Sequence, residues 1–120
     1  MSIKQVKRGE IYYANLSNNN IGSEQNGIRP VVVIQNDIGN YYSPTTIVAV
    51  ITSICKKTNM PVHLFLPKEK FNLKEDSIVM LEQIRTIDKK RLLRKVSELD
   101  EEYINLLDEK LKISLGLIQF

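Results

Sequence analysis

Residues 22–40, GSEQNGIRPVVVIQNDIGN, determine more of the predicted fold than any other stretch of the chain. A polar loop, residues 22–27, is followed by Arg29, by Pro30 and by the apolar run 31–34. Proline is tolerated at the first position of a strand, and a run that is apolar on both faces is typical of a central strand. The pattern places Arg29 at the mouth of a loop, where its planar guanidinium can bind a phosphate or a carboxylate.

Apolar and β-branched runs on both sides of this stretch predict further strands. Residues 11–16 (IYYANL) precede a polar cluster, and residues 46–52 (TIVAVIT) are largely β-branched. Residues 62–66 and 77–86 continue the pattern on either side of a charged turn region. Residues 92–99 are either a last strand or an extended connector.

The C-terminal part of the chain has the pattern of a helix over residues 100–116. Asp100 precedes two acidic residues that oppose the helix dipole, and Gly116 is a stop signal. Apolar residues at three- and four-residue spacing predict one buried stripe: Ile104, Leu107, Leu111 and Leu115. We therefore expect one domain over residues 1–120, with a small, partly closed, mostly antiparallel barrel over 1–99 and the helix packed against it.

Charge is divided unevenly along the chain, whose net charge is +3. Residues 1–99 carry fifteen Lys and Arg against nine Asp and Glu, whereas residues 100–120 carry two against five. A basic body suits a polyanionic partner or an acidic protein tail, but ordinary solubilising charge explains the excess equally well. The N-terminus has no apolar signal core and no apolar run approaches membrane-spanning length, so we expect a cytoplasmic protein that does not enter a membrane.

Most conventional catalytic and cofactor sites are excluded by composition. The single histidine, His63, cannot serve as both acid and base, and the single cysteine, Cys55, cannot form an internal disulfide. A catalytic Cys–His pair would need these two residues, for which we favour packing roles. Because the chain also lacks a glycine-rich nucleotide fingerprint and spaced metal-binding carboxylates, we expect neither a metal nor another cofactor.

Four segments of the chain, in the same order as in the family, resemble the MazF/PemK toxin endoribonucleases. They are VKRGEIYYANL, GSEQNGIRPVVVIQND, TIVAVIT and VMLEQIRTIDKKRL, followed by a helix that ends in SLGL. Together they cover nearly the whole chain, and the GSEQ-x-G-x-RP segment is the most diagnostic. The resemblance implies an α+β protein, mostly β with a C-terminal helix, whose small SH3-like barrel is of the CcdB/MazF type.

The resemblance also implies a reaction. Family members are homodimeric endoribonucleases that cut single-stranded mRNA at a short specific sequence without a metal ion. The ribose 2′-hydroxyl attacks the adjacent phosphorus and leaves a 2′,3′-cyclic phosphate and a 5′-hydroxyl end. Because the substrate supplies the nucleophile, the protein has to position groups, handle protons and stabilise a doubly charged phosphorane. Members are inhibited by an antitoxin whose acidic, partly disordered tail occupies the RNA groove.

By position in the matching segments, the resemblance implies three catalytic residues. Arg29 matches the essential arginine, and Thr52 matches its partner threonine, whose hydroxyl can bond a phosphate oxygen. Glu24 matches a functional acid of some relatives, which would accept a proton or bond a base. Without the resemblance, these residues read as a surface arginine, a strand-forming threonine and a solvated acid.

Six further residues are implied in RNA binding: Ser23, Gln25, Lys56, Lys57, Glu82 and Gln83. Two of them, the lysines, lie in the loop 53–61, which is either a flap beside the RNA groove or a solvated hairpin tip. Some relatives carry a histidine at the position of Ser23, and an arginine and an aspartate at those of Met80 and Glu82. A general base assigned from those relatives therefore cannot be transferred to this chain.

Two other classes of function stay open. CcdB-like toxins use the same fold to trap DNA gyrase and catalyse nothing, although the GSEQ-x-G-x-RP segment argues against them. The second alternative is a non-catalytic SH3-like module that binds RNA or an acidic peptide.

Overall fold

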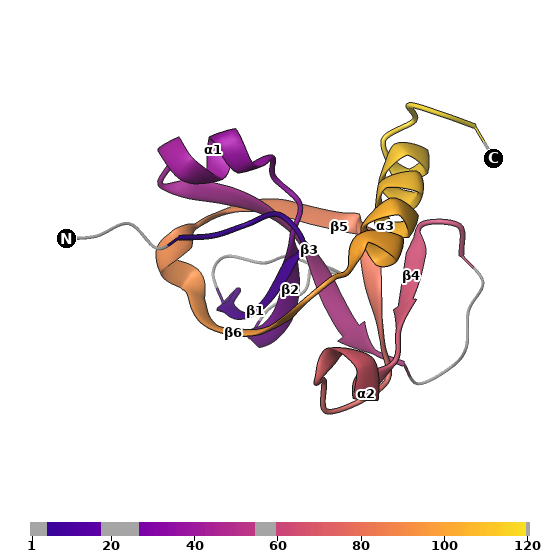
Figure 1. The fold of residues 1–120 in the computed structure, drawn as a ribbon, viewed down its shortest axis with the longest axis horizontal. Helices are drawn as coiled ribbons and strands as arrows, with labels where there is room; N and C mark the ends of the chain where they lie inside the picture. Colours follow the sequence, from indigo (N-terminus) through magenta and orange to yellow (C-terminus); the bar gives the residue numbers. More distant parts are fainter. Residues whose placement is uncertain (1–4, 18–26, 55–59, 120) are drawn as a thin grey trace.

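The computed structural model describes residues 5–17, 27–54 and 60–119. Within these ranges, six strands form one antiparallel sheet, unclosed, in the order β4-β5-β3-β2-β1-β6. The strands are β1 (Glu10–Asn15), β2 (Ile28–Val33), β3 (Thr45–Ser53), β4 (His63–Leu66), β5 (Ser77–Asp88) and β6 (Leu92–Glu98). The helical elements are α1 (Asp37–Tyr42), α2 (Lys68–Phe71), the 3-10 turn η1 (Lys89–Arg91) and α3 (Glu101–Ser114). Figure 1 shows β1, β2 and β6 at one end of the molecule and β4, α2 and α3 at the other.

The predicted strands are confirmed, with shifts at their ends. Strand β2 lies between β1 and β3, as expected of a central strand, and residues 92–98 form a strand rather than a connector. The prediction that Pro30 begins its strand is wrong, because β2 begins at Ile28 and Pro30 pairs with Tyr13 of β1. Proline is tolerated there because the pairing of β2 with β3 includes Val31 but not Pro30, so the missing N–H breaks no bond of that ladder.

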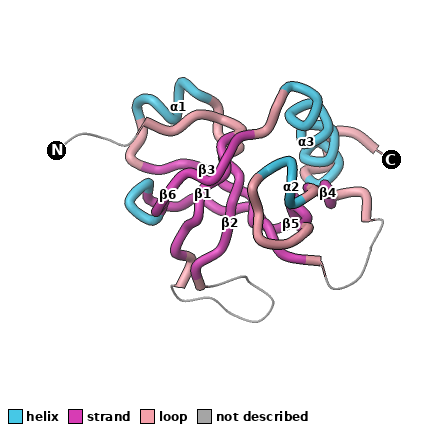
Figure 2. Tube along the Cα trace, turned by 60° about the horizontal axis from the view of Figure 1, so that its bottom comes forward, coloured by secondary structure: helices cyan, strands magenta, loops and turns pink. Residues whose placement is uncertain are grey.

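The sheet has a hydrophobic cluster on each face, because successive residues of a strand point to opposite sides. One cluster packs against α3, and the other lies across the sheet from it. The first includes Ile11, Ala49, Ile51, Phe71, Leu81 and Leu107, and the second Tyr12, Val31, Val48, Val50 and Met80. Figure 2 shows α2 and α3 together beside β4 and β5, away from α1.

A bulge, seen as a shift in the register with β3, divides β5 into two halves. Val50 of β3 is paired with Met80, but its neighbour Ala49 is paired with Ile84, so residues 81–83 are inserted between the two pairs. Bulges bend a strand and re-aim its side chains. The half of β5 before the bulge also pairs with β4, so β5 lies between β4 and β3 there.

The C-terminal helix is confirmed, with one correction. Leu107 is buried, and Ile104 and Leu111 pack against the first cluster. Leu115 was predicted to complete the stripe, but it is 52% exposed because the helix ends at Ser114 and Gly116 turns the chain at φ +74°. None of the helices in the described ranges is long and apolar enough to cross a membrane.

The start of α3 gives a prediction about pH. The Asp100 carboxylate pairs with Lys70 Nζ at 2.9 Å and accepts a hydrogen bond from the N–H of Tyr103 at 3.0 Å. Both contacts lower the pKa of Asp100, and the contact with Lys70 has the larger effect. A carboxylate whose pKa is lowered by folding stabilises the protein above its ordinary pKa of about 3.9, and the contribution is lost as pH falls through the folded-state pKa.

We therefore expect wild type to be more stable than Asp100→Asn at pH 7 and 5, and the difference to shrink at pH 3. Asparagine is a good N-cap, so the substitution removes the charge while keeping the cap. Urea unfolding of both proteins at the three pH values measures the difference. A difference in stability of equal size at pH 7 and pH 3 would contradict the lowered pKa of Asp100.

Candidate functional site: a notch between two strands

The pairing of β2 with β3 stops before either strand ends. The paired positions run from Val33–Val48 to Val31–Val50. Beyond them, β2 stays paired with β1 as far as Ile28, and β3 stays paired with β5 as far as Ser53. The two pairs of strands therefore diverge and leave a notch between the ends of β2 and β3.

Arg29 and Thr52 lie on the two sides of this notch. Each is two residues beyond the last pair, Val31–Val50, so their side chains continue the face of the sheet that these valines occupy. Both residues line one pocket of about 550 Å³, and both are partly exposed. The structure thus brings together the two described members of the predicted catalytic set, which are 23 positions apart in the sequence.

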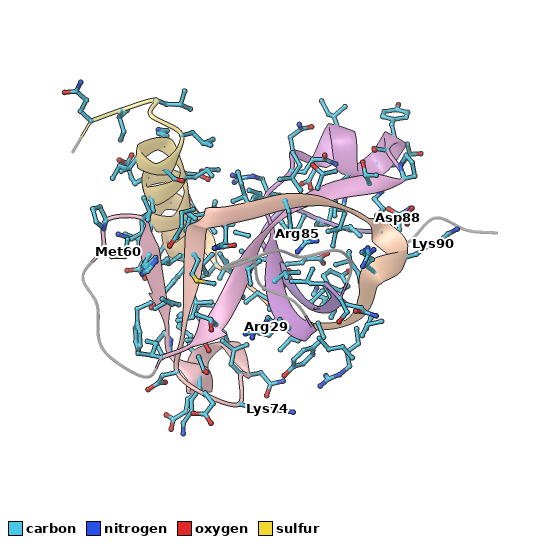
Figure 3. The ribbon with its side chains drawn as sticks, turned by 180° about the vertical axis from the view of Figure 1, so that it is seen from behind. Arg29, Met60, Lys74, Arg85, Asp88 and Lys90 are labelled. Atoms are coloured by element: carbon cyan, nitrogen blue, oxygen red, sulfur yellow. The ribbon has the colours of Figure 1, made fainter. Side chains whose placement is uncertain are left out.

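Further lining comes from β1, from the segment that joins α2 to β5 and from the first residue of β5. Tyr13 contributes from β1, and Leu73, Lys74, Glu75 and Ser77 contribute from the other side. Figure 3 shows Lys74 and Arg29 at the same end of the molecule. None of these residues was predicted to belong to the site, because residues 67–76 have only the pattern of a charged turn region and Tyr13 and Ser77 only that of strand residues.

The pocket is suited to an anionic ligand that accepts hydrogen bonds. Two of the described residues that line it, Arg29 and Lys74, are cations, and one, Glu75, is a carboxylate. Thr52, Ser53 and Ser77 add hydroxyl groups. A guanidinium can donate two parallel bonds to phosphate oxygens, and a hydroxyl can donate a third.

The other predicted site residues do not lie in this pocket or cannot be placed. Ser23, Glu24, Gln25, Lys56 and Lys57, and with them Cys55, lie outside the described residues. Glu82 and Gln83 lie in the bulge of β5 and are not among the described residues that line the pocket. Glu82 instead meets His63, a half-buried residue of β4 whose Nε2 lies 2.8 Å from Glu82 Oε2. Across the described ranges, no three His, Cys, Asp or Glu side chains are placed to hold a metal ion.

Comparison with known proteins assigns the family. Residues 7–115 match the model of the PemK-like, MazF-like toxins of type II toxin–antitoxin systems. The chain belongs to this family. It is 53% identical over 115 residues to endoribonuclease EndoA of Bacillus subtilis (strain 168), covering 96% of this chain and 98% of the relative.

Solved structures of the toxin family share the fold. MazF from Deinococcus radiodurans superposes with a TM-score of 0.76 at 22% identity, over 94% of this chain and 98% of that one. A mycobacterial endoribonuclease in complex with its cognate antitoxin has a TM-score of 0.73 at 18% identity, over 96% and 99% of the two chains. The similarity confirms the predicted CcdB/MazF type of fold.

Proposed function

We propose that this protein is a sequence-specific endoribonuclease, the toxin of a type II toxin–antitoxin pair, that cuts single-stranded mRNA in the cytoplasm without a metal ion. The observation that carries the proposal is the pocket that Arg29 and Thr52 both line, one on each side of the notch. The family assignment supports it, as does the 53% identity to an endoribonuclease.

The reaction we propose needs few protein groups. The 2′-hydroxyl of the substrate attacks the adjacent phosphorus, the bond to the 5′-oxygen of the next nucleotide breaks, and a 2′,3′-cyclic phosphate and a 5′-hydroxyl result. Arg29 stabilises the negative charge that builds on the phosphorane, and Thr52 donates a hydrogen bond to one of its oxygens. Glu24 is our candidate for the proton acceptor.

Further residues would bind and read the RNA strand. We assign this role to Ser23, Gln25, Lys56, Lys57, Glu82 and Gln83. The contact of Glu82 with His63 fixes one carboxylate oxygen, so the other is the one available to accept from a base amino group. We propose that the active form is a homodimer and that a cognate antitoxin with an acidic tail competes for the same groove. The structure of the similar toxin with its antitoxin supports such a partner.

The direct test is to incubate the purified protein with single-stranded transcripts in the presence of EDTA and to map the new 5′ ends. We expect cuts at one short sequence, with 5′-hydroxyl ends that a polynucleotide kinase labels without prior phosphatase treatment. Intact RNA together with inhibited gyrase supercoiling would instead support the CcdB-like alternative.

Substitutions of Thr52 test its proposed hydrogen bond. Thr52→Val keeps the shape of the side chain but removes the hydroxyl, so we expect the cleavage rate to fall by about 10-fold or more, the loss of one bond to a charged group. Thr52→Ser keeps the hydroxyl and should retain most of the activity. Single-turnover cleavage of one mapped substrate gives both rates, and equal rates for the Val and Ser variants would exclude the role.

A further inference from the structure

Two cations gather around an aromatic ring at the wall of the pocket. The Nζ of Lys74 lies 6.0 Å from the centroid of the Tyr13 ring, and the Cζ of Arg94 lies 4.9 Å from it. Arg94 stands directly opposite Tyr13 in the pairing of β6 with β1, whereas Lys74 comes from the segment between α2 and β5. Tyr13 and Lys74 themselves line the pocket that contains Arg29.

Within the part of the chain that the structure describes, neither cation holds the fold together by an ion pair. Lys95, the next residue of β6, pairs with Glu10 at 2.9 Å, and Lys70 of α2 pairs with Asp100 at 2.9 Å. Lys74 and Arg94 are exposed, and neither forms an ion pair with a carboxylate of the described residues. Their positive charges are therefore available to a ligand.

The aromatic ring gives these cations a defined position. An ammonium or guanidinium group within about 6 Å of a ring centroid is attracted to the ring face. Exposed lysine and arginine side chains otherwise lose rotamer freedom when they bind, so a ring that orients them beforehand lowers that cost. Tyr13 is half-buried between Arg94 and Pro30 in the register of the sheet, which fixes its backbone on both sides.

We propose that Lys74 and Arg94, positioned by Tyr13, form a second phosphate-binding site for the RNA backbone beside the scissile linkage. The proposal rests on the proposed function, because it takes Arg29 as the group that meets the scissile phosphate. Single-stranded RNA carries one negative charge per nucleotide, so a strand held at Arg29 brings neighbouring phosphates to the walls of the same pocket. Arg29 and Lys74 line the pocket and Arg94 lies against the ring of Tyr13 at its wall, so these three cations outweigh Glu75, the one carboxylate among the described residues that line it.

RNA is favoured over an acidic peptide because the site combines cations with an aromatic ring. Both ligands would be attracted by the charge, but the planar guanidinium that the ring holds in place also offers a surface on which a nucleobase can stack. Carboxylates of a peptide gain nothing from that surface.

The first test measures binding without cleavage. A fluorescein-labelled 12-nucleotide RNA with 2′-O-methyl groups throughout lacks the attacking hydroxyl, so its affinity can be followed by anisotropy at several salt concentrations. For single-stranded nucleic acid, each phosphate contact contributes about 0.7 to the slope of log K against log salt. We expect the double variant Lys74→Ala/Arg94→Ala to have a slope about 1.4 less steep than wild type.

The matched control is Lys90→Ala/Lys112→Ala, which removes the same charge from η1 and α3. Lys90 lies far from Lys74 in Figure 3. If both double variants change the slope equally, only net charge matters and the proposed site is wrong. If the Lys74→Ala/Arg94→Ala variant loses affinity for an oligoglutamate peptide but not for the RNA, the cluster serves an acidic peptide and the proposal is also overturned.

A second test addresses the positioning role of Tyr13. Tyr13→Phe keeps the ring and should bind the RNA like wild type, whereas Tyr13→Leu leaves both charges in place but should bind about five-fold more weakly. Thermal unfolding shows whether each variant is folded. Wild-type affinity of a folded Tyr13→Leu variant would remove Tyr13 from the site.

Cleavage assays separate the two proposals. With a cleavable RNA, the Lys74→Ala/Arg94→Ala variant should show a raised KM and a kcat close to wild type, because it contacts a neighbouring phosphate rather than the reacting one. A protein that cuts no RNA, but whose salt slope falls as expected, would refute the proposed function and leave the phosphate site standing. If the wild-type protein cuts RNA but the Lys74→Ala/Arg94→Ala variant has the wild-type salt slope, the phosphate site is refuted and the proposed function stands.

Discussion

Arg29→Ala is expected to lower the rate of RNA cleavage by roughly two to three orders of magnitude. Removing one preorganised group that stabilises transition-state charge typically costs that much. Arg29 is partly exposed on β2, and the Val31–Val50 pair sets where its backbone lies across the notch from Thr52. The substitution should therefore remove the guanidinium without changing the strand that carries it.

Arg29→Lys is the matched control, because it keeps the positive charge but loses the planar fork. Lysine binds phosphate as a point charge and cannot make two parallel bonds, so we expect affinity for RNA to recover more than the cleavage rate does. Single-turnover cleavage and anisotropy on the 2′-O-methyl RNA measure the two effects separately. Cleavage by Arg29→Ala at the wild-type rate would place the active site elsewhere.

The sequence predicted Arg29 and Thr52 as a pair only through the resemblance to the toxin family. Taken by themselves, one was a surface arginine and the other a strand former. The pairing of β2 with β3 supplies the physical reason, since it sets both residues two positions beyond the last paired valines on one face of the sheet. Strand alternation was readable from the sequence, but the register that aligns position 29 with position 52 was not.

The parts of the site that come from irregular segments could not be predicted. Lys74 reaches the pocket because α2, four residues long, turns the chain back through Asn72 in the left-handed conformation at φ 57°. A helix of one turn has too few residues for a periodic pattern to appear. The bulge that carries Glu82 was also hidden, because residues 77–86 read as one uninterrupted strand.

The burial of Leu115 was also predicted wrongly, because it depends on the residue at which α3 ends. The spacing of Leu115 matched that of Leu107 and Leu111, but periodicity does not say at which residue a helix stops. Here the chain turns at Gly116, so Leu115 follows the last helical residue and points away from the core.

Phe71→Ala is expected to destabilise the protein by about 3–5 kcal/mol, the usual cost of emptying a buried aromatic site. Phe71 is 2% exposed, and its ring meets the Tyr103 ring of α3 edge to face, with centroids 4.8 Å apart. Its backbone carbonyl also accepts a bond from Ser97 Oγ at 2.7 Å. This one side chain therefore joins α2 to both α3 and the core.

Phe65→Ala is the control, because Phe65 precedes Phe71 by six residues, on β4, but is 46% exposed, and its loss should cost far less. Urea unfolding of the two variants measures the difference, and in thermal unfolding Phe71→Ala should melt about 10 °C or more below Phe65→Ala. Equal stabilities would show that α2 is not anchored through Phe71.

If α2 is anchored through Phe71, the Phe71→Ala variant should also bind the 2′-O-methyl RNA more weakly under conditions where it remains folded. The segment that follows Phe71 carries Lys74 to the pocket, so a loosened α2 leaves that cation without a fixed position beside Tyr13.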